Sequence, residues 1–272
     1  MFWDVSAATE GENLQMSSPE QTQPSQAVLE QQLYERAAQL SDRFGVDIRI
    51  AEQCSLDYSH YDSYALTDPT FIRSALDILE ESLSKYPEGF FLQLPYGSIE
   101  SIRIELVGGL KLKSNVTTYT DDAGAFAQDR GRYYGIVLNG FVMSEKTLYH
   151  EFSHIIDSRL EWDALIRTDA LYSEEAWLAL QPEGFSYAMS YTHVPEELLS
   201  FANSGYFVCN YALTYPTEDR ATLMEAAMEN YTWDFEPGSG SRAKMQYYAD
   251  CIRDCFDTTG WPATTLWEQV LE

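Results

Sequence analysis

The segment His150-Glu-Phe-Ser-His154 constrains this chain more than any other feature of its sequence. In an α-helix, residues four apart lie on the same face, so both imidazoles can point at one metal ion. Glu151 follows one step round the helix, where its carboxylate can act as general base toward a metal-activated water. The segment also contains half of the four histidines in the chain. This spacing predicts a catalytic zinc site.

The residues around the motif predict a helix with one buried side. Ser144 is a favourable N-cap, and Glu145 suits the positive end of the helix dipole. An apolar stripe at helical spacing consists of Leu148, Phe152, Ile155 and Ile156. His150, His154 and Asp157 fall on the opposite side. We expect Asp157 to accept a hydrogen bond from a ligand imidazole, the alternative being an exposed acid at the end of the helix.

Composition limits the partners of the chain. The sequence has 17 Lys and Arg against 43 Asp and Glu, a formal net charge of -26. Nucleic acids and anionic membranes bind basic patches, so we expect neither partner. The sequence contains no apolar run of about 20 residues that would span a membrane. The first residues also lack the basic start and apolar stretch of a signal peptide.

The order of patterns along the chain predicts an α+β fold with a small mixed sheet, followed by a mostly helical part that carries the zinc site. Residues 1–26 are rich in Ser, Gln and Glu and are expected to form a flexible tether. The remainder divides into an α+β portion, 27–140, and a helical portion, 141–272. Within the first portion we expect helices at 28–43 and from Asp68-Pro69 onward, strands at 46–50, 102–106 and 133–139, and a polar loop at 115–129.

The strand expected at 133–139 directly precedes the zinc helix. In many zinc peptidases an edge strand beside the site pairs with an extended substrate, and this strand is the candidate by position. A plain core strand is the alternative. The four cysteines are expected to be free, buried thiols, because their spacing fits neither a zinc knuckle nor a bridge within a helix.

A catalytic zinc ion usually takes three protein ligands. The third histidine of the metzincin motif is absent, because Asp157 stands where that motif has Gly and the sequence diverges further at Leu160. His60 and His193 remain, and both are expected on the surface, with His193 kept as an alternative ligand.

An acid on a downstream helix is a better candidate for the third ligand. Glu218 lies in the first turn of a helix that begins after Pro216. The residues alone do not separate Glu218 from Glu225, or from Glu196 and Glu197.

Tyr149-His-Glu-Phe-Ser-His-Ile-Ile-Asp157 resembles the active-site helix of the anthrax lethal factor group of zinc peptidases. It resembles still more a bacterial family of zinc-binding metallopeptidases, many of them secreted lipoproteins. Two further segments match the pattern of that family, Trp177-Leu-Ala-Leu-Gln-Pro-Glu-Gly-Phe-Ser-Tyr187 and Glu218-Asp-Arg-Ala221. The resemblance covers residues 130–256, and the N-terminal half matches no family that we can name.

The resemblance implies a zincin-like catalytic core of the gluzincin type within residues 27–272. It implies one Zn²⁺ ion held by His150, His154 and Glu218, with Glu151 as general base. It also implies that Tyr211, seven residues before Glu218, stabilises the transition state. Tyr215 is its rival for that role.

The activity implied by the resemblance is that of a zinc-dependent endopeptidase acting on peptide or protein substrates. We expect a monomer that is extracellular or a cell-surface lipoprotein, held at a membrane only by an N-terminal lipid anchor absent from this sequence. A cytoplasmic location is the alternative. Rival functions are hydrolysis of a non-peptide amide, a degenerate peptidase without activity, and a cell-surface interaction protein. The intact Glu151 disfavours the degenerate form, since ligands without a base suffice for structural zinc.

Overall fold

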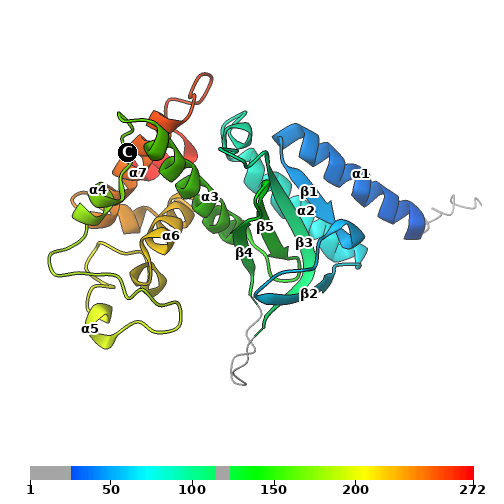
Figure 1. Cartoon of the computed structure of the whole chain (residues 1–272), viewed down its shortest axis with the longest axis horizontal. Coiled ribbons are helices and arrows are strands. Elements are labelled where there is room, and N and C mark those ends of the chain that lie inside the picture. Colours follow the sequence, from blue (N-terminus) through cyan, green and yellow to red (C-terminus); the bar gives the residue numbers. More distant parts are fainter. Residues whose placement is uncertain (1–25, 114–122) are drawn as a thin grey trace, which may run out of the picture.

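Five strands form one mixed sheet within residues 26–113 and 123–272, the part of the chain that the computed structural model describes (Figure 1). Four of them follow the order β1-β3-β5-β4, and β2 pairs with β3 outside this path. Their bounds are Asp47–Ile50 for β1, Tyr61–Ala65 for β2, Ser101–Leu112 for β3, Ala125–Asp129 for β4 and Tyr133–Asn139 for β5. The predicted tether, except its last residue, and residues 114–122 lie outside the described residues.

β1, β3 and β5 run parallel to one another, whereas β2 and β4 are antiparallel to the strands they pair with. β3 pairs in parallel with β1 and β5, which places Ile104 between Ile48 and Ile136. β4 pairs antiparallel with β5 and forms the edge of the sheet. The sequence of β3 predicts a half-buried strand in which Ile102, Ile104 and Leu106 alternate with Arg103 and Glu105. The three apolar residues are fully buried in the main core, as expected, but Glu105 is buried as well, so both faces of the strand are covered there.

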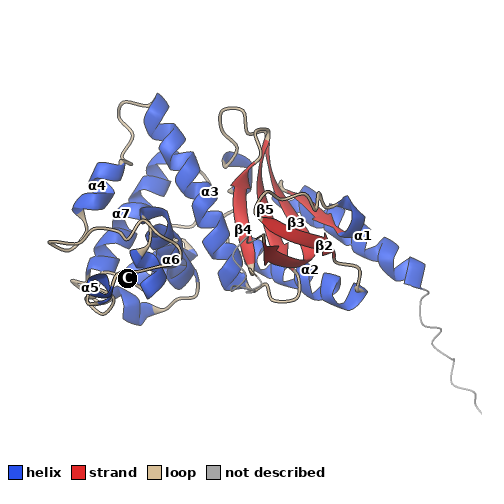
Figure 2. Ribbon diagram, turned by 60° about the horizontal axis from the view of Figure 1, so that its bottom comes forward, coloured by secondary structure: helices blue, strands red, loops and turns tan. Residues whose placement is uncertain are grey.

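Helices α1 (Gln26–Phe44) and α2 (Pro69–Ser84) cover one face of the sheet (Figure 2). Asp68 caps α2 by accepting a hydrogen bond from the Thr70 amide at 2.8 Å, and Pro69 occupies its first turn, as predicted. The helical spacing of α2 predicts six inward apolar residues, and five of them are buried: Ile72, Ala75, Leu76, Leu79 and Leu83. The sixth, Phe71, is 42% exposed and packs edge-on against Phe141.

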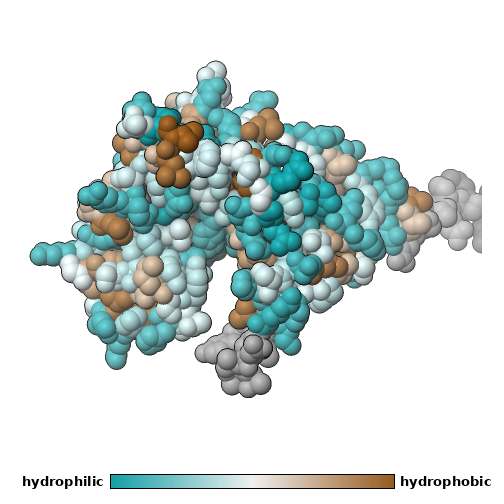
Figure 3. Space-filling model, in the orientation of Figure 1, coloured by the Kyte–Doolittle hydropathy of each residue, from teal (hydrophilic) through white to brown (hydrophobic). Residues whose placement is uncertain are grey.

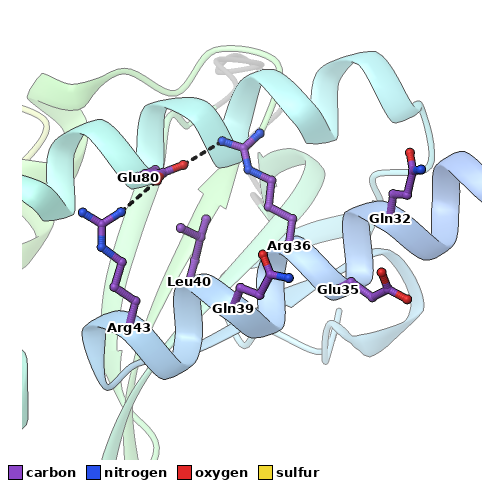
Figure 4. Close-up of a pocket in the computed structure, with 7 residues that line it drawn as sticks. All are labelled: Gln32, Glu35, Arg36, Gln39, Leu40, Arg43 and Glu80. Carbon is purple, nitrogen blue, oxygen red and sulfur yellow. Dashed lines mark hydrogen bonds and ion pairs between the residues drawn. The ribbon is translucent and has the colours of Figure 1, made fainter.

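A shallow groove runs between α1 and α2 (Figure 4). Glu80 accepts hydrogen bonds from Arg36 at 2.9 Å and from Arg43 at 2.8 Å across the groove. Arg36 also pairs with Asp77 at 2.6 Å. These guanidinium groups already have carboxylate partners, so we interpret the groove as part of the packing between α1 and α2 and not as a binding site.

The opposite face of the sheet carries a smaller apolar cluster formed by Cys54, Tyr58, Val107, Leu110 and Val137. Glu105 is buried beside it and accepts hydrogen bonds from the Ser55 amide and the Tyr58 hydroxyl. This cluster gives the sheet a second covered face.

The helical portion follows the sheet and begins with the long helix α3, Glu145–Ile166. α3 lies between the sheet and the remaining helices (Figure 1). The remaining helices are α4 (Glu174–Ala179), α5 (Glu196–Leu199), α6 (Pro216–Met228) and α7 (Gly240–Cys255), and a short 3-10 turn, η3, spans Asn210–Leu213. The main core runs without interruption from α1 and α2 through α3 into α6 and α7, so the two portions share one core.

Two expectations about the sheet need correction, and one of its strands was not predicted. The predicted polar loop at 115–129 contains β4, so its last five residues are a strand. β5 lies between β3 and β4 and is therefore a core strand, which leaves β4 as the edge. β2, next to His60, was not predicted.

The four cysteines are free thiols, as expected, but only Cys54 and Cys251 are buried, while Cys209 is exposed and Cys255 is partly exposed. Among the described helices, none combines the length and the apolar character needed to cross a lipid bilayer.

Candidate metal centre

The local sequence explains why α3 forms where the motif lies. Ser144 caps the helix by accepting a hydrogen bond from the Thr147 amide at 3.2 Å, as predicted. The predicted apolar stripe of Leu148, Phe152, Ile155 and Ile156 is fully buried. Burial of this stripe fixes the rotation of α3, so the opposite side, with His150 and His154, is presented to α6.

The structure brings His150, His154 and Glu218 together into a group that can hold a metal ion. Glu218 Oε2 lies 3.0 Å from His150 Nε2 and 3.6 Å from His154 Nε2. Ligand atoms around a tetrahedral zinc ion, with bonds near 2.0–2.1 Å, are about 3.3 Å apart. Two imidazoles and a carboxylate at this spacing match the donor set of catalytic zinc, so the residues fit the ion.

Glu218 reaches the histidines because of how α6 begins. Tyr215 occupies the N-cap position and Pro216 the first turn, which places Glu218 at the N-terminal end of the helix facing α3. Its side chain is 4% exposed.

Glu225, the rival acid, holds the other nitrogen of His150. Glu225 Oε2 lies 3.3 Å from His150 Nδ1, and Lys146 pairs with the same carboxylate at 2.8 Å. A carboxylate at the far nitrogen of a metal-binding imidazole orients the ring and raises its basicity. The two acids that the sequence left unresolved thus occupy opposite nitrogens of one ring.

The other sequence candidates lie away from this group. Glu196 and Glu197 are exposed in α5. His60 and His193 are exposed, as expected, and His193 is not part of the metal-binding group.

The two imidazoles have opposite electrostatic surroundings. Burial acts to lower the pKa of His150, but its hydrogen bonds to Glu218 and Glu225 outweigh burial and raise the pKa to about 10. Burial lowers the pKa of His154 to about 4, against the attraction of Glu218. In the metal-free protein the two carboxylates therefore favour the protonated form of His150, whereas His154 stays neutral at neutral pH.

Glu151 is a buried carboxylate with a raised pKa. It is 7% exposed, and burial raises its pKa to about 7, against the opposing effect of His150. The backbone of Ala127 in β4 hydrogen-bonds this carboxylate. A carboxyl group with a pKa near 7 can both take up and give back a proton at neutral pH.

Tyr211 lies on η3 next to the metal-binding group. Its ring centroid is 6.0 Å from that of His150, and its side chain is 41% exposed. Tyr215 packs instead on Tyr191, with ring centroids 4.3 Å apart. Of the two tyrosines left open by the sequence, Tyr211 is therefore the one in contact with the histidine.

Tyr191 is a neighbour of the site that the sequence did not reveal. It is 59% exposed, and Glu218 is among the charges that raise its pKa. The segment that carries it is irregular, but it is anchored by hydrogen bonds from the Ala188 and Met189 amides to Leu213 and Thr214 carbonyls. An irregular segment has no periodic pattern in its sequence, so the sequence could not predict that Tyr191 lies near the metal-binding group.

The expectation for Asp157 was wrong. Asp157 is buried and accepts a hydrogen bond from Arg220 at 2.7 Å, rather than one from a ligand imidazole. Asp157 lies seven residues after His150, and this spacing correctly predicted that it lies on the side of α3 that faces α6. Its carboxylate, however, pairs with Arg220 of α6.

The two downstream segments that carry the resemblance meet inside the protein. Trp177 is fully buried and donates from Nε1 to the Tyr187 hydroxyl at 3.0 Å. Tyr187 donates in turn to Asp219 at 2.6 Å, and Lys244 of α7 lies 2.7 Å from the same oxygen. These contacts join the start of α6 to α7 and to the segment around Tyr187.

The molecular surface is hollowed between the helical portion and the sheet portion (Figure 3). α3 lies at the junction of these portions, with β4 on one side and α6 on the other. The metal-binding group lies where α3 meets α6.

Comparison with known proteins finds no relative, since no protein-family model, curated protein or solved structure matches this chain. The chemistry of the metal-binding group and its neighbours is thus the basis for assigning a function.

Proposed function

We propose that this protein is a zinc-dependent endopeptidase with a zincin-like core. The observation that carries the proposal is the position of Glu151. A buried carboxyl group with a pKa of about 7 lies beside a His-His-Glu group and is hydrogen-bonded to an edge strand. A structural zinc site has no use for such a group.

In this proposal His150, His154 and Glu218 hold one Zn²⁺ ion, with Glu225 behind His150. The bound ion would supply a Lewis acid and would favour ionisation of a water molecule. Glu151 accepts a proton from that water as its oxygen forms a bond to the peptide carbonyl carbon. When the C–N bond breaks, Glu151 returns the proton to the departing amine, which leaves a carboxylic acid, a free amine and an ionised Glu151.

Tyr211 is assigned to the developing oxyanion. Its hydroxyl is partly exposed beside His150, and burial raises its pKa, so the phenol keeps its proton at neutral pH. A neutral phenol donates a hydrogen bond to the carbonyl oxygen as that oxygen gains negative charge.

The edge strand β4 favours a peptide over a small amide as substrate. The Asn139 amide donates to Gly124 and the Arg130 amide donates to Tyr133, and hydrogen-bonded pairs alternate along an antiparallel ladder. The backbone groups of Ala125, Ala127 and Asp129 therefore point away from β5. An extended peptide can add to this edge and lie beside Glu151, which the Ala127 backbone already reaches.

The test combines metal analysis with one isosteric variant. Protein purified without added zinc should contain close to one equivalent, and Glu151→Gln should retain the zinc and lose cleavage of a peptide library. Glu161→Gln is the matched control, because Glu161 is exposed on the same helix and should leave both properties unchanged.

Two results would refute the proposal. Less than about 0.1 equivalent of zinc, not restored by added zinc, would remove the metal site. Full cleavage by Glu151→Gln would remove Glu151 from the role of base. Retained zinc without cleavage of any peptide in the library would instead support the zinc-binding interaction protein.

A further inference from the structure

Three consecutive residues in the first turn of α6 are charged and buried. Glu218, Asp219 and Arg220 are 4%, 0% and 1% exposed. Successive helix residues point about 100° apart, so the three side chains diverge toward different elements. Only Glu218 belongs to the metal-binding group, which leaves two buried charges without an assigned role.

Arg220 connects the two helices that carry the metal-binding residues. Its Nε lies 2.7 Å from Asp157 Oδ2, and both side chains are almost completely buried. Asp157 belongs to α3, three residues after His154, and Arg220 belongs to α6, two residues after Glu218. A second nitrogen of Arg220 lies 3.1 Å from Glu174 of α4. The ion pair thus joins α3 to α6 within one turn of the metal-binding group.

Asp219 forms a similar buried ion pair, which joins α6 to α7 and not to α3. Its Oδ2 lies 2.7 Å from Lys244 Nζ of α7, and both side chains are fully buried. Tyr187 donates to the same oxygen. The two pairs start from adjacent residues and are equally buried, but only Arg220 reaches the helix of the histidines.

Stability does not by itself explain a buried pair of this kind. Removing two charges from water carries a desolvation penalty, and replacement of a buried ion pair by apolar residues of similar volume is often neutral or stabilising. A buried pair can instead fix one relative placement of the elements it joins. We infer that Asp157 and Arg220 are positioning residues, which set the spacing between Glu218 and the two histidines.

This inference rests on the proposed metal site, and its test measures zinc affinity rather than cleavage. The variant Asp157→Leu/Arg220→Met replaces the pair with apolar side chains. Zinc affinity, measured by competition with a chromophoric chelator, should fall about 10- to 100-fold, as for other residues that orient metal ligands. Circular dichroism and the melting temperature of the metal-free protein should stay near those of the wild type.

Asp219→Leu/Lys244→Met is the matched control and should change zinc affinity less than about threefold, because this pair leaves α3 untouched. The absorption spectrum of the Co²⁺-loaded protein provides an independent readout of ligand geometry. It should change for the Asp157/Arg220 variant only.

The inference is overturned if both double variants fold and lose zinc affinity equally, or if the Asp157/Arg220 variant binds zinc like the wild type. If that variant does not fold, Arg220→Lys decides, because lysine keeps the charge but loses the planar fork that reaches Asp157 and Glu174. Weaker zinc binding by Arg220→Lys supports the inference, and unchanged binding overturns it.

A wild type that binds no zinc would refute the proposed function and this inference together, whereas a zinc-binding wild type with an unaffected variant refutes the inference alone.

Discussion

His150 is held between two glutamates, one at each ring nitrogen. This arrangement assigns different roles to Glu218 and Glu225, although both lie on one stripe of α6. The carboxylate near Nε2 shares the metal-binding group with His154, while the carboxylate near Nδ1 can only orient the ring and raise its basicity.

Glu225→Ala should therefore weaken zinc binding about tenfold, while Glu218→Ala should weaken it much more strongly because a ligand is lost. Chelator competition measures both. Glu229→Ala is the control, since Glu229 follows one turn later at the end of α6 and should have no effect. Equal losses for Glu218→Ala and Glu225→Ala would contradict these roles.

Tyr211→Phe should lower kcat about 10²- to 10³-fold and leave zinc content unchanged, because in the proposed mechanism the phenol hydroxyl acts only on the developing oxyanion. Steady-state kinetics on a cleaved peptide measure this effect. Tyr215→Phe is the matched control, as its ring packs on Tyr191. A larger loss for Tyr215→Phe would exchange the roles of the two tyrosines.

At the level of elements, α3 and β4 together frame the site. α3 supplies the histidines and Glu151, and β4 supplies the edge strand whose Ala127 backbone reaches Glu151. In β4 the direction of the backbone groups alternates, so neighbouring residues should differ in their tolerance of proline.

Ala127→Pro should fold, because the Ala127 amide points away from β5, but it should lower peptide cleavage about tenfold or more by removing the hydrogen bond to Glu151. Gln128→Pro is the contrasting variant. The Gln128 amide lies in the ladder with β5, so this change should lower the melting temperature. A destabilised Ala127→Pro beside a stable Gln128→Pro would show that the assigned ladder is shifted by one residue.

The elements that the sequence predicted well are those with strong periodic or capping signals. The N-caps Ser144 and Asp68 are read from neighbouring residues, and both are found as expected. The alternation on β3 is found only in part, because its polar residue Glu105 is buried. β4 was missed because its sequence, Ala-Phe-Ala-Gln-Asp, has a single large apolar residue and follows a polar stretch. That omission also made β5 look like an edge.

Contacts between residues far apart in the sequence were harder to predict than the helices and strands themselves. The spacing of Asp157 gives the side of α3 on which it lies, but the arrival of Arg220 from 63 residues away depends on how α6 docks. The same docking separates Glu218 from Glu225. Helix periodicity places both on one face and carries no information about which turn of α6 meets His150.

At the scale of the whole molecule, one core extends through both portions, while the metal-binding group joins α3 to α6. An ion bound there should stabilise the folded chain. At a free Zn²⁺ concentration 100 times the Kd, linkage predicts about 2.7 kcal/mol, which corresponds to a rise of about 5 to 10 °C in melting temperature for a domain of this size. Calorimetry with and without zinc measures the rise, and His154→Ala should abolish it.

The reactivity of the cysteine thiols tests the fold independently of the metal site. Burial raises the pKa of Cys54 and of Cys251 to about 12, whereas Cys209 is exposed. In the folded protein a disulfide reagent such as Ellman's should react first with Cys209, and Cys54 and Cys251 should react only after unfolding. Rapid reaction of Cys54 in the native protein would contradict its place beneath β3.

Glu218 lies 64 positions after His154, and the chain between them includes α4, α5 and η3. Part of this stretch has its own small core of Tyr187, Phe207, Ala212 and Leu213. An ion that ties both ends of this stretch together acts as a cross-link. By the loop-closure relation used for disulfides, a cross-link closing about 64 residues removes about 4 kcal/mol of entropy from the unfolded chain. An ion at the proposed site would thus also fasten the segment that carries Tyr191 and Tyr211 at its base. Chelation of that ion should make this segment the first to be cut by proteases.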